Sequence, residues 1–187
     1  MNDVMLDLET FGTNENKCVC QIGACYFDNR TGEIGRELKI NVNAASHIRK
    51  GAKIDADTVY WWLQQSDEAR KSLLENKVDV TLAFNELNGF IANAKRVWSH
   101  ATFDFVTLME TFKMLDIKPS ISYKAGLDIR TLVYLAGLKV VRINREGIHH
   151  DALADCRHQV KYCVAALNAV KTNKATMAFI AKVQNEG

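Results

Sequence analysis

The stretch MLDLET, residues 5–10, decides the fold that we expect for this chain. Apolar and other side chains alternate around it, and a period of two is typical of a β-strand. Such a strand has two faces, one formed by Val4, Leu6 and Leu8 and the other by Met5, Asp7 and Glu9. The second face therefore turns acidic at the carboxyl end of the strand, where both carboxylates lie within reach of one cation.

The segments after this strand predict an antiparallel meander. Residues 18–28 and 33–43 are rich in β-forming side chains, and NRTG (29–32) between them predicts a turn. Residues 44–53 are polar and basic and predict a loop.

The remainder of the chain predicts helices and one further strand. One helix opens at the capping residue Asp55, and another opens at Ser66. A helix is expected over 81–94, with Leu82, Leu87, Phe90 and Ile91 near one face, and a short strand follows at RVWS (96–99). The next helix has Phe105, Leu108, Met109 and Phe112 at i, i+3, i+4 and i+7, and a loop follows at Pro119. A helix over 127–137 ends at Gly137, and a long helix begins at about Ala152 with one apolar stripe: Leu153, Cys156, Val160, Cys163, Val164 and Leu167. This order predicts an α/β fold with a mixed sheet flanked by helices.

The composition is that of a soluble chain with one domain over residues 1–187, since 48% of the residues are hydrophobic and 25% are charged. The formal net charge is only +2. Any nucleic-acid partner is therefore expected to be held by a local basic patch or by metal ions. The beginning of the chain carries no targeting signal, and no segment has the roughly 18 apolar residues of a membrane span. We expect a cytoplasmic protein without a membrane partner.

The five cysteines are expected to be reduced core thiols, because their number is odd and their surroundings are apolar. They are Cys18, Cys20, Cys25, Cys156 and Cys163. A zinc site is the alternative, but the pair Cys18-x-Cys20 is not followed by a second pair.

Three acidic patterns carry the functional prediction. They are Asp7-x-Glu9 on the first strand, Asp104 at the opening turn of a helix, and His150 with Asp155 at the start of the last helix. Each pattern alone is also typical of an ordinary surface feature: a solvated strand end, an acid favoured by the helix dipole, or a surface histidine beside a capping aspartate.

Together, the four carboxylates indicate a metal site. Carboxylates gathered in one place repel one another unless a divalent cation neutralises them. Oxygen ligands favour Mg²⁺ or Mn²⁺, and two such ions stabilise the attacking and leaving oxygens of a phosphoryl displacement. An imidazole with a pKa near 6.5 is suited to take the proton from the attacking water.

DLET, a central FD and a late HxxxxD, in this order, resemble the DEDD superfamily of 3'-to-5' exonucleases in its histidine-bearing (DEDDh) branch. The resemblance covers nearly the whole chain. The stretches DTVYWWLQQSDEAR and LDIRTL are further similar to a ribonuclease T-like subgroup found in phages, prophages and some bacteria.

The resemblance implies a ribonuclease H-like fold with a mixed five-stranded sheet. It implies two Mg²⁺ or Mn²⁺ ions held by Asp7, Glu9, Asp104 and Asp155, with Asp7 between them. Glu9 and His150 are the implied catalytic residues, and the spacing to Asp155 selects His150 as general base over His149. Many relatives carry an asparagine where this chain has His100, so how the substrate is oriented there stays open.

The substrate contacts are expected among aromatic and basic residues near these patterns. Trp61 and Trp62 are adjacent, so on a helix they cannot both face the core squarely. One of them, Trp62, is a candidate stacking platform for a terminal base, and the alternative is that both simply pack. Phe11 is similar to positions where relatives place an aromatic against the terminal nucleotide. The predicted contacts are Thr10, Phe11, Trp62, His100 and Arg145, with Arg49, Lys50, Lys53 and Arg142 as further phosphate-binding candidates or, alternatively, solvated charges.

The expected activity is 3'-to-5' hydrolysis of single-stranded DNA or RNA from its 3' end to nucleoside 5'-monophosphates. The phage-like resemblance favours DNA slightly over RNA. A nucleic-acid-binding module without catalysis and a purely structural protein are the alternatives. A homodimer through TMAFIAKV (176–183) is a further expectation, with a core helix as its alternative.

Overall fold

The computed structural model of the chain describes residues 1–140 and 143–172. Its five-stranded sheet has the order β3-β2-β1-β4-β5. β1 pairs antiparallel with β2, and β2 with β3, whereas β1–β4 and β4–β5 are parallel. The strands are β1 (Asp3–Thr10), β2 (Val19–Phe27), β3 (Ile34–Asn41), β4 (Arg96–Ser99) and β5 (Gly126–Asp128). The predicted meander and the mixed five-stranded sheet are both confirmed.

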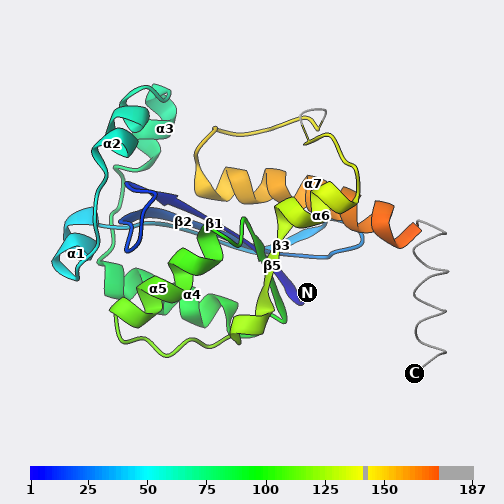
Figure 1. Ribbon diagram of the computed structural model, residues 1–187, viewed down its shortest axis with the longest axis horizontal. Coiled ribbons are helices and arrows are strands. Elements are labelled where there is room, and N and C mark those ends of the chain that lie inside the picture. Colours follow the sequence, from blue (N-terminus) through cyan, green and yellow to red (C-terminus); the bar gives the residue numbers. More distant parts are fainter. Residues whose placement is uncertain (141–142, 173–187) are drawn as a thin grey trace.

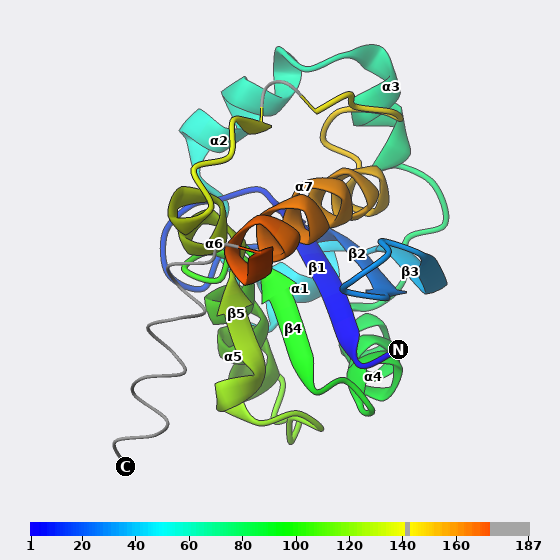
Figure 2. The ribbon, with the colours of Figure 1, turned by 90° about the vertical axis from the view of Figure 1, so that its right-hand side faces the viewer.

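Helices cover both faces of this sheet. One layer contains α4 and α5, the opposite layer contains α6 and α7, and α2 with α3 stands at one end of the sheet (Figures 1 and 2). The helices are α1 (Ala44–Arg49), α2 (Ala56–Leu63), α3 (Asp67–Ser72), α4 (Val80–Ile91), α5 (Asp104–Met114), α6 (Ile129–Leu135) and α7 (Ala152–Thr172), with a 3-10 turn at Tyr123–Ala125. No helix in the described ranges is long and apolar enough to cross a membrane.

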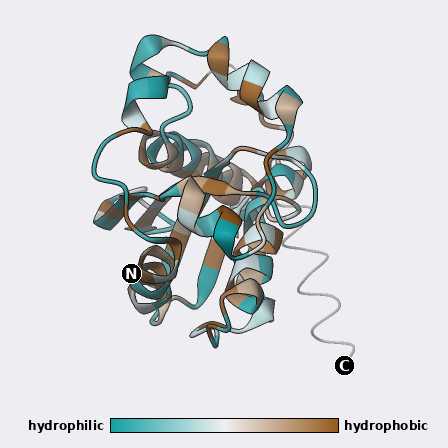
Figure 3. Ribbon diagram, turned by 90° about the vertical axis from the view of Figure 1, so that its left-hand side faces the viewer, coloured by the Kyte–Doolittle hydropathy of each residue, from teal (hydrophilic) through white to brown (hydrophobic). Residues whose placement is uncertain are grey.

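The alternation in β1 divides the core as the sequence predicts. Val4, Leu6 and Leu8 pack with α4 and α5, whereas Met5 packs with β2 and α7 on the other face. Hydrophilic and hydrophobic residues alternate along the helices and strands, as expected of elements with one buried face (Figure 3). All five cysteines are buried and unpaired, as expected of core thiols.

Three predictions about secondary structure are wrong. Residues 44–53 contain α1, which depends on capping and buried polar groups: Asn43 accepts a hydrogen bond from the Ser46 backbone N–H, and Ser46 and His47 are buried. Leu127 and Asp128 belong to β5 and precede α6. Leu82 is 63% exposed, because Ala83, Phe84, Leu87 and Ile91 form the buried face of α4.

Gly23 lets α7 begin directly on the sheet. This glycine lies opposite Asp7 in the β1–β2 register. A Cβ atom there would lie 2.2 Å from the backbone carbon of Ala152, the first residue of α7. The Ala152 N–H also donates to Oε1 of buried Gln21 at 2.7 Å. The start of α7 is therefore fixed beside the acidic end of β1.

Candidate active site

β1 presents Asp7 and Glu9 on one face at its carboxyl end. Both side chains are buried, with exposed fractions of 7% and 9%. Gln159 of α7 donates from Nε2 to Oδ1 of Asp7 at 2.7 Å. The pairing of β1 with β2 shifts register between Glu9 and Thr10, so regular pairing ends at the site.

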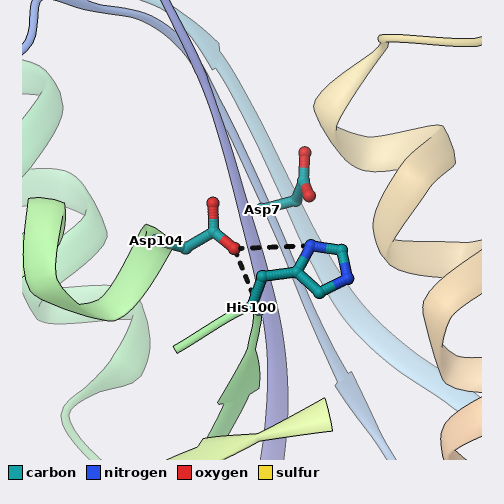
Figure 4. Close-up of side chains that lie close together, drawn as sticks. All are labelled: Asp7, His100 and Asp104. Carbon is teal, nitrogen blue, oxygen red and sulfur yellow. Dashed lines mark hydrogen bonds and ion pairs between the residues drawn. The ribbon is translucent and has the colours of Figure 1, made fainter. Parts of the chain in front are cut away.

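Two backbone N–H groups hold the Asp104 carboxylate, one near the end of β1 and one directly after β4. Asp104 opens α5, and its carboxylate accepts hydrogen bonds from the Leu8 N–H at 3.3 Å and the His100 N–H at 3.0 Å. The His100 ring approaches the same carboxylate, with Nδ1 4.0 Å from Oδ2 (Figure 4). Asp7, His100 and Asp104 therefore come from three different elements and converge, each offering a ligand atom within 4.8 Å of the others.

The third acidic pattern joins the site through Asp155 on the first turn of α7. Ligand atoms of Glu9, His150 and Asp155 also lie within 4.8 Å of one another. His150 precedes the helix with a φ of 62°, a left-handed conformation that a non-glycine residue rarely adopts. The structure thus brings all five predicted DEDDh residues together in two groups, one with Asp7 and Asp104 and the other with Glu9, His150 and Asp155.

The carboxylates carry more negative charge than the chain neutralises. Burial raises the pKa of Asp7 to about 6, although the Gln159 hydrogen bond and Arg145 act in the opposite direction. Burial and the neighbouring charges of Asp7 and Asp104 raise the pKa of Glu9 well above its ordinary value. Burial and the charge of Asp7 do the same for Asp104. Buried carboxylates that repel one another in this way are stabilised when a cation binds between them.

The donor set fits Mg²⁺ or Mn²⁺. Carboxylate oxygens dominate both groups, and no cysteine contributes to a cluster of metal-binding side chains in the described part of the chain. Among the described residues, the only added nitrogen donors of the two groups are the rings of His100 and His150. Burial lowers the pKa of His100 to about 4, so this ring is neutral near pH 7 and its nitrogen lone pair is available to a metal.

The pKa of His150 differs from the value near 6.5 that the sequence led us to expect. Its pKa is lowered to about 4, first by burial and then by the charges of His149 and Arg145. Its Nε2 lies 2.9 Å from Nδ1 of His149, and its ring meets Trp61 edge-on at a centroid distance of 4.7 Å. The expected value near 6.5 left out this aromatic and cationic surrounding.

A cavity of about 410 Å³ adjoins Glu9. Trp61 and Phe103 are its aromatic walls, and Thr10 also lines it. The complete lining is Leu8, Glu9, Thr10, Thr13, Asp57, Thr58, Trp61 and Phe103. Sequence reasoning missed Phe103, although its place directly before Asp104 was a usable signal.

The two tryptophans separate clearly. Trp62 is 4% exposed and donates its indole N–H to the Thr10 carbonyl at 2.9 Å, whereas Trp61 is 40% exposed. The burial of Trp62 argues against its predicted stacking role. Phe11 meets Trp62 edge-on and lines a different, largely apolar cavity of about 560 Å³.

Among the predicted phosphate contacts, Arg145 lies in the site and forms an ion pair with Asp155. Arg49, Lys50 and Lys53 are exposed in and after α1. Arg142 and the predicted dimer segment 176–183 lie outside the described residues.

Comparison with known proteins agrees with this geometry. A family model described as the 3'-5' exoribonuclease Rv2179c-like domain matches residues 2–167. The chain belongs to this family. It is therefore an exonuclease domain that hydrolyses nucleic acid, and the predicted DEDDh resemblance is confirmed. No curated protein sequence matches the chain.

Solved structures of exonucleases share its fold. Exonuclease X in complex with 5' overhanging duplex DNA has a TM-score of 0.59 at 15% identity and covers 95% of this chain and 98% of its own. The nuclease domain of 3'hExo, a DEDDh family member bound to rAMP, has a TM-score of 0.61 at 10% identity, with coverages of 89% and 91%. E. coli exonuclease I with a dT13 oligonucleotide has a TM-score of 0.62 at 18% identity, and the match spans 95% of this chain but 42% of that protein.

Proposed function

We propose that this chain is a 3'-to-5' exoribonuclease that removes nucleoside 5'-monophosphates from single-stranded RNA ends. The observation that carries the proposal is the convergence of Asp7, Glu9, Asp104, Asp155 and His150 in two adjoining groups of ligand atoms. The family description names exoribonuclease activity, and for this reason we propose RNA as the substrate in place of the DNA that the sequence slightly favoured.

Asp7, Glu9, Asp104 and Asp155 would hold two Mg²⁺ or Mn²⁺ ions, with the neutral ring of His100 beside Asp7 and Asp104. When bound, the ions supply stabilisation of the charge that develops on the attacking and leaving oxygens. The hydrogen bonds to Asp7 from Gln159 and to Asp104 from two backbone N–H groups hold these carboxylates in place before substrate arrives.

His150 is the proposed general base. Its ring is neutral near pH 7 and so has a free lone pair, and the carboxylates of Glu9 and Asp155 beside it would stabilise the imidazolium that forms when it accepts the proton of the attacking water. The water oxygen forms a bond to phosphorus, and the bond from phosphorus to the 3' oxygen of the preceding nucleotide breaks. The departing 3' oxygen takes up a proton from solvent, and His150 returns its proton to solvent. The products are a nucleoside 5'-monophosphate and a strand shortened by one nucleotide with a free 3' hydroxyl.

The cavity beside Glu9 is suited to the terminal nucleoside. Trp61 and Phe103 offer aromatic surface to a base, and such stacking is tolerant of sequence. Thr58 adds a hydroxyl group that can donate to the sugar or base edge. The Thr10 hydroxyl donates to the Gly12 carbonyl at 2.6 Å and can therefore only accept a hydrogen bond from the substrate. A base reaches a recessed cavity of this kind only from an unpaired strand end, which supports the preference for single strands.

The decisive experiment compares 5'-labelled single-stranded RNA and DNA of matched sequence with the protein and Mn²⁺. We expect a ladder that shortens from the 3' end, faster on RNA, and that stops in EDTA. Faster cleavage of DNA would contradict the RNA assignment alone. Binding of the strands without shortening in Mn²⁺ or Mg²⁺ would instead support a binding module and would contradict the enzymatic proposal.

A further inference from the structure

Arg145 places a fixed positive charge among the proposed metal ligands. Its guanidinium is ion-paired with the Asp155 carboxylate. The same charge opposes the rise that burial causes in the pKa of both Asp7 and Glu9. Within residues 1–140 and 143–172, no lysine or other arginine forms an ion pair with any of the four carboxylates.

The Arg145 guanidinium and a metal ion would compete for the same carboxylate, that of Asp155. Asp155 belongs to the group with Glu9 and His150 in which ligand atoms lie within 4.8 Å of one another. An ion bound there would face the guanidinium at short range, and like charges repel strongly in a partly buried site. A carboxylate oxygen that Arg145 engages is also less available as a metal ligand.

Arg145 is held loosely compared with other arginines of the molecule. Its Nε is buried and has no acceptor among the described residues. By contrast, Arg157 pairs with both oxygens of Glu37, at 2.6 and 2.7 Å. Arg145 lies in a segment before α7 that forms neither helix nor strand, and its side chain is 24% exposed. Leaving Asp155 would therefore break few contacts.

We propose that Arg145 is an exchangeable counterion of the active site: it pairs with Asp155 until a divalent cation displaces it. This inference rests on the proposed function, because it takes the carboxylates to be metal ligands. The exchange makes occupation by a divalent cation a competition, so Arg145 sets how much metal the second group of ligands requires. Once displaced, the guanidinium is free to meet a substrate phosphate, which reconciles its ion pair with its predicted role.

The test measures Mn²⁺ binding without nucleic acid, by the electron paramagnetic resonance signal of free Mn²⁺. We expect Arg145→Gln to bind Mn²⁺ about twofold to fivefold more tightly than the wild type, the range that ion pairs of this exposure represent. Arg145→Lys keeps the charge but loses the planar fork, and its affinity should lie between the two. Lys161→Gln is the matched control, because it removes a nearby positive charge that pairs with Glu146 and not with a metal ligand.

A second measurement guards against a variant that simply folds less well. In EDTA, Arg145→Gln should melt at a lower temperature than the wild type, because the carboxylates lose their internal cation, and its gain on adding Mn²⁺ should be larger. Lys161→Gln should show neither change. Equal or weaker Mn²⁺ binding by folded Arg145→Gln would overturn the exchange, while a wild type that binds no Mn²⁺ at all would overturn the proposed function itself.

Discussion

The two halves of the active site are built differently. Asp7 and Asp104 are held by regular structure, the first on β1 with a Gln159 hydrogen bond and the second by two backbone N–H groups. His150 lies in an irregular segment and has a left-handed backbone conformation, and the Asp155 carboxylate forms an ion pair with Arg145. The group with Asp7 and Asp104 is therefore arranged by the sheet before any ligand binds. The group with His150 and Asp155 depends on a loop and on the exchange of the Arg145 guanidinium for a metal ion.

The largest expected effect is in the prearranged half. Asp104→Asn should reduce nuclease activity about a thousandfold or more, because it removes a buried ligand of the charge-stabilising site. It should not lower the melting temperature in EDTA, because a neutral amide ends the repulsion with Asp7. Activity on labelled RNA and thermal unfolding check the two expectations.

Asp3→Asn, on β1, is the control for loss of a buried carboxylate outside the site. Asp3 accepts hydrogen bonds from Arg96 and Trp98 and lies outside the site. This variant should lose stability and keep its rate per folded molecule. A comparable loss of rate in Asp3→Asn would mean that the Asp104 effect reflects general damage to the sheet.

The next effect concerns the loop half. His150→Ala should lower kcat about a hundredfold to ten-thousandfold, the usual contribution of a general base, while leaving Mn²⁺ binding by Asp7 and Asp104 intact. His149→Ala provides the comparison, since His149 touches His150 but belongs to neither ligand group. Single-turnover rates at saturating RNA separate the two, and equal losses would remove the distinction between these histidines.

A smaller effect is expected at the cavity wall. Trp61→Ala should raise KM about fivefold to a hundredfold, which corresponds to the loss of one stacked base, with less effect on kcat. Tyr60→Ala is the control, because Tyr60 is an exposed aromatic of the same helix that does not line the cavity. If both variants have the KM of the wild type, the terminal base does not stack on Trp61.

The smallest effect is a dependence of stability on pH. The pKa of Asp7 in the folded chain is raised from 3.8 to about 6, so the folded state binds the proton more tightly than the unfolded state. The stability that this proton contributes is complete below about pH 4 and is lost as the pH rises through 6. In EDTA, the melting temperature of the wild type relative to Asp7→Asn should therefore fall over this interval.

Other carboxyl groups act in the opposite sense, so the difference between the two proteins is the quantity to measure. Burial opposes ionisation of Asp3, yet hydrogen bonds from Arg96 and Trp98 and the Arg96 charge keep its pKa lowered. Its contribution is lost as the pH falls. Mn²⁺ should reduce the part of the pH dependence of the melting temperature that is due to Asp7. If the melting temperatures of the wild type and Asp7→Asn change equally with pH in EDTA, ionisation of Asp7 does not destabilise the folded chain.

The prearranged half was predictable from sequence, and the loop half only in part. A period of two assigned Asp7 to one strand face, together with Glu9 of the other group, and the opening of a helix located Asp104. Such local patterns survive folding because the strand and helix impose them. The position of His150 followed from its spacing to Asp155. Its pKa is lowered first by burial beside Trp61 and then by the charges of His149 and Arg145, and of these only the neighbouring His149 is visible in the local sequence.

The errors elsewhere have similar physical causes. α1 is short and is fixed by a tertiary contact, since the Val19 N–H donates to buried His47 at 3.1 Å. β5 has three residues and is defined only by its pairing with β4. Adjacent Trp61 and Trp62 point in different directions from one helix. Trp62 is buried against Cys20, Ala69 and Leu73 and donates its indole N–H to the Thr10 carbonyl, contacts that come from outside its own helix.

The contact between Gly23 and the start of α7 bears on which ions the site can accept. Because Ala152 rests against a position with no room for a side-chain carbon, van der Waals contact sets how far α7 stands from β1 before any ligand arrives. The hydrogen bond from the Ala152 N–H to Oε1 of Gln21 opposes a larger separation, so the distance between β1 and the helix that carries Asp155 is fixed in both directions. We expect selection by ionic radius, with ions the size of Mg²⁺ or Mn²⁺ favoured over Ca²⁺, which binds oxygen at longer distances.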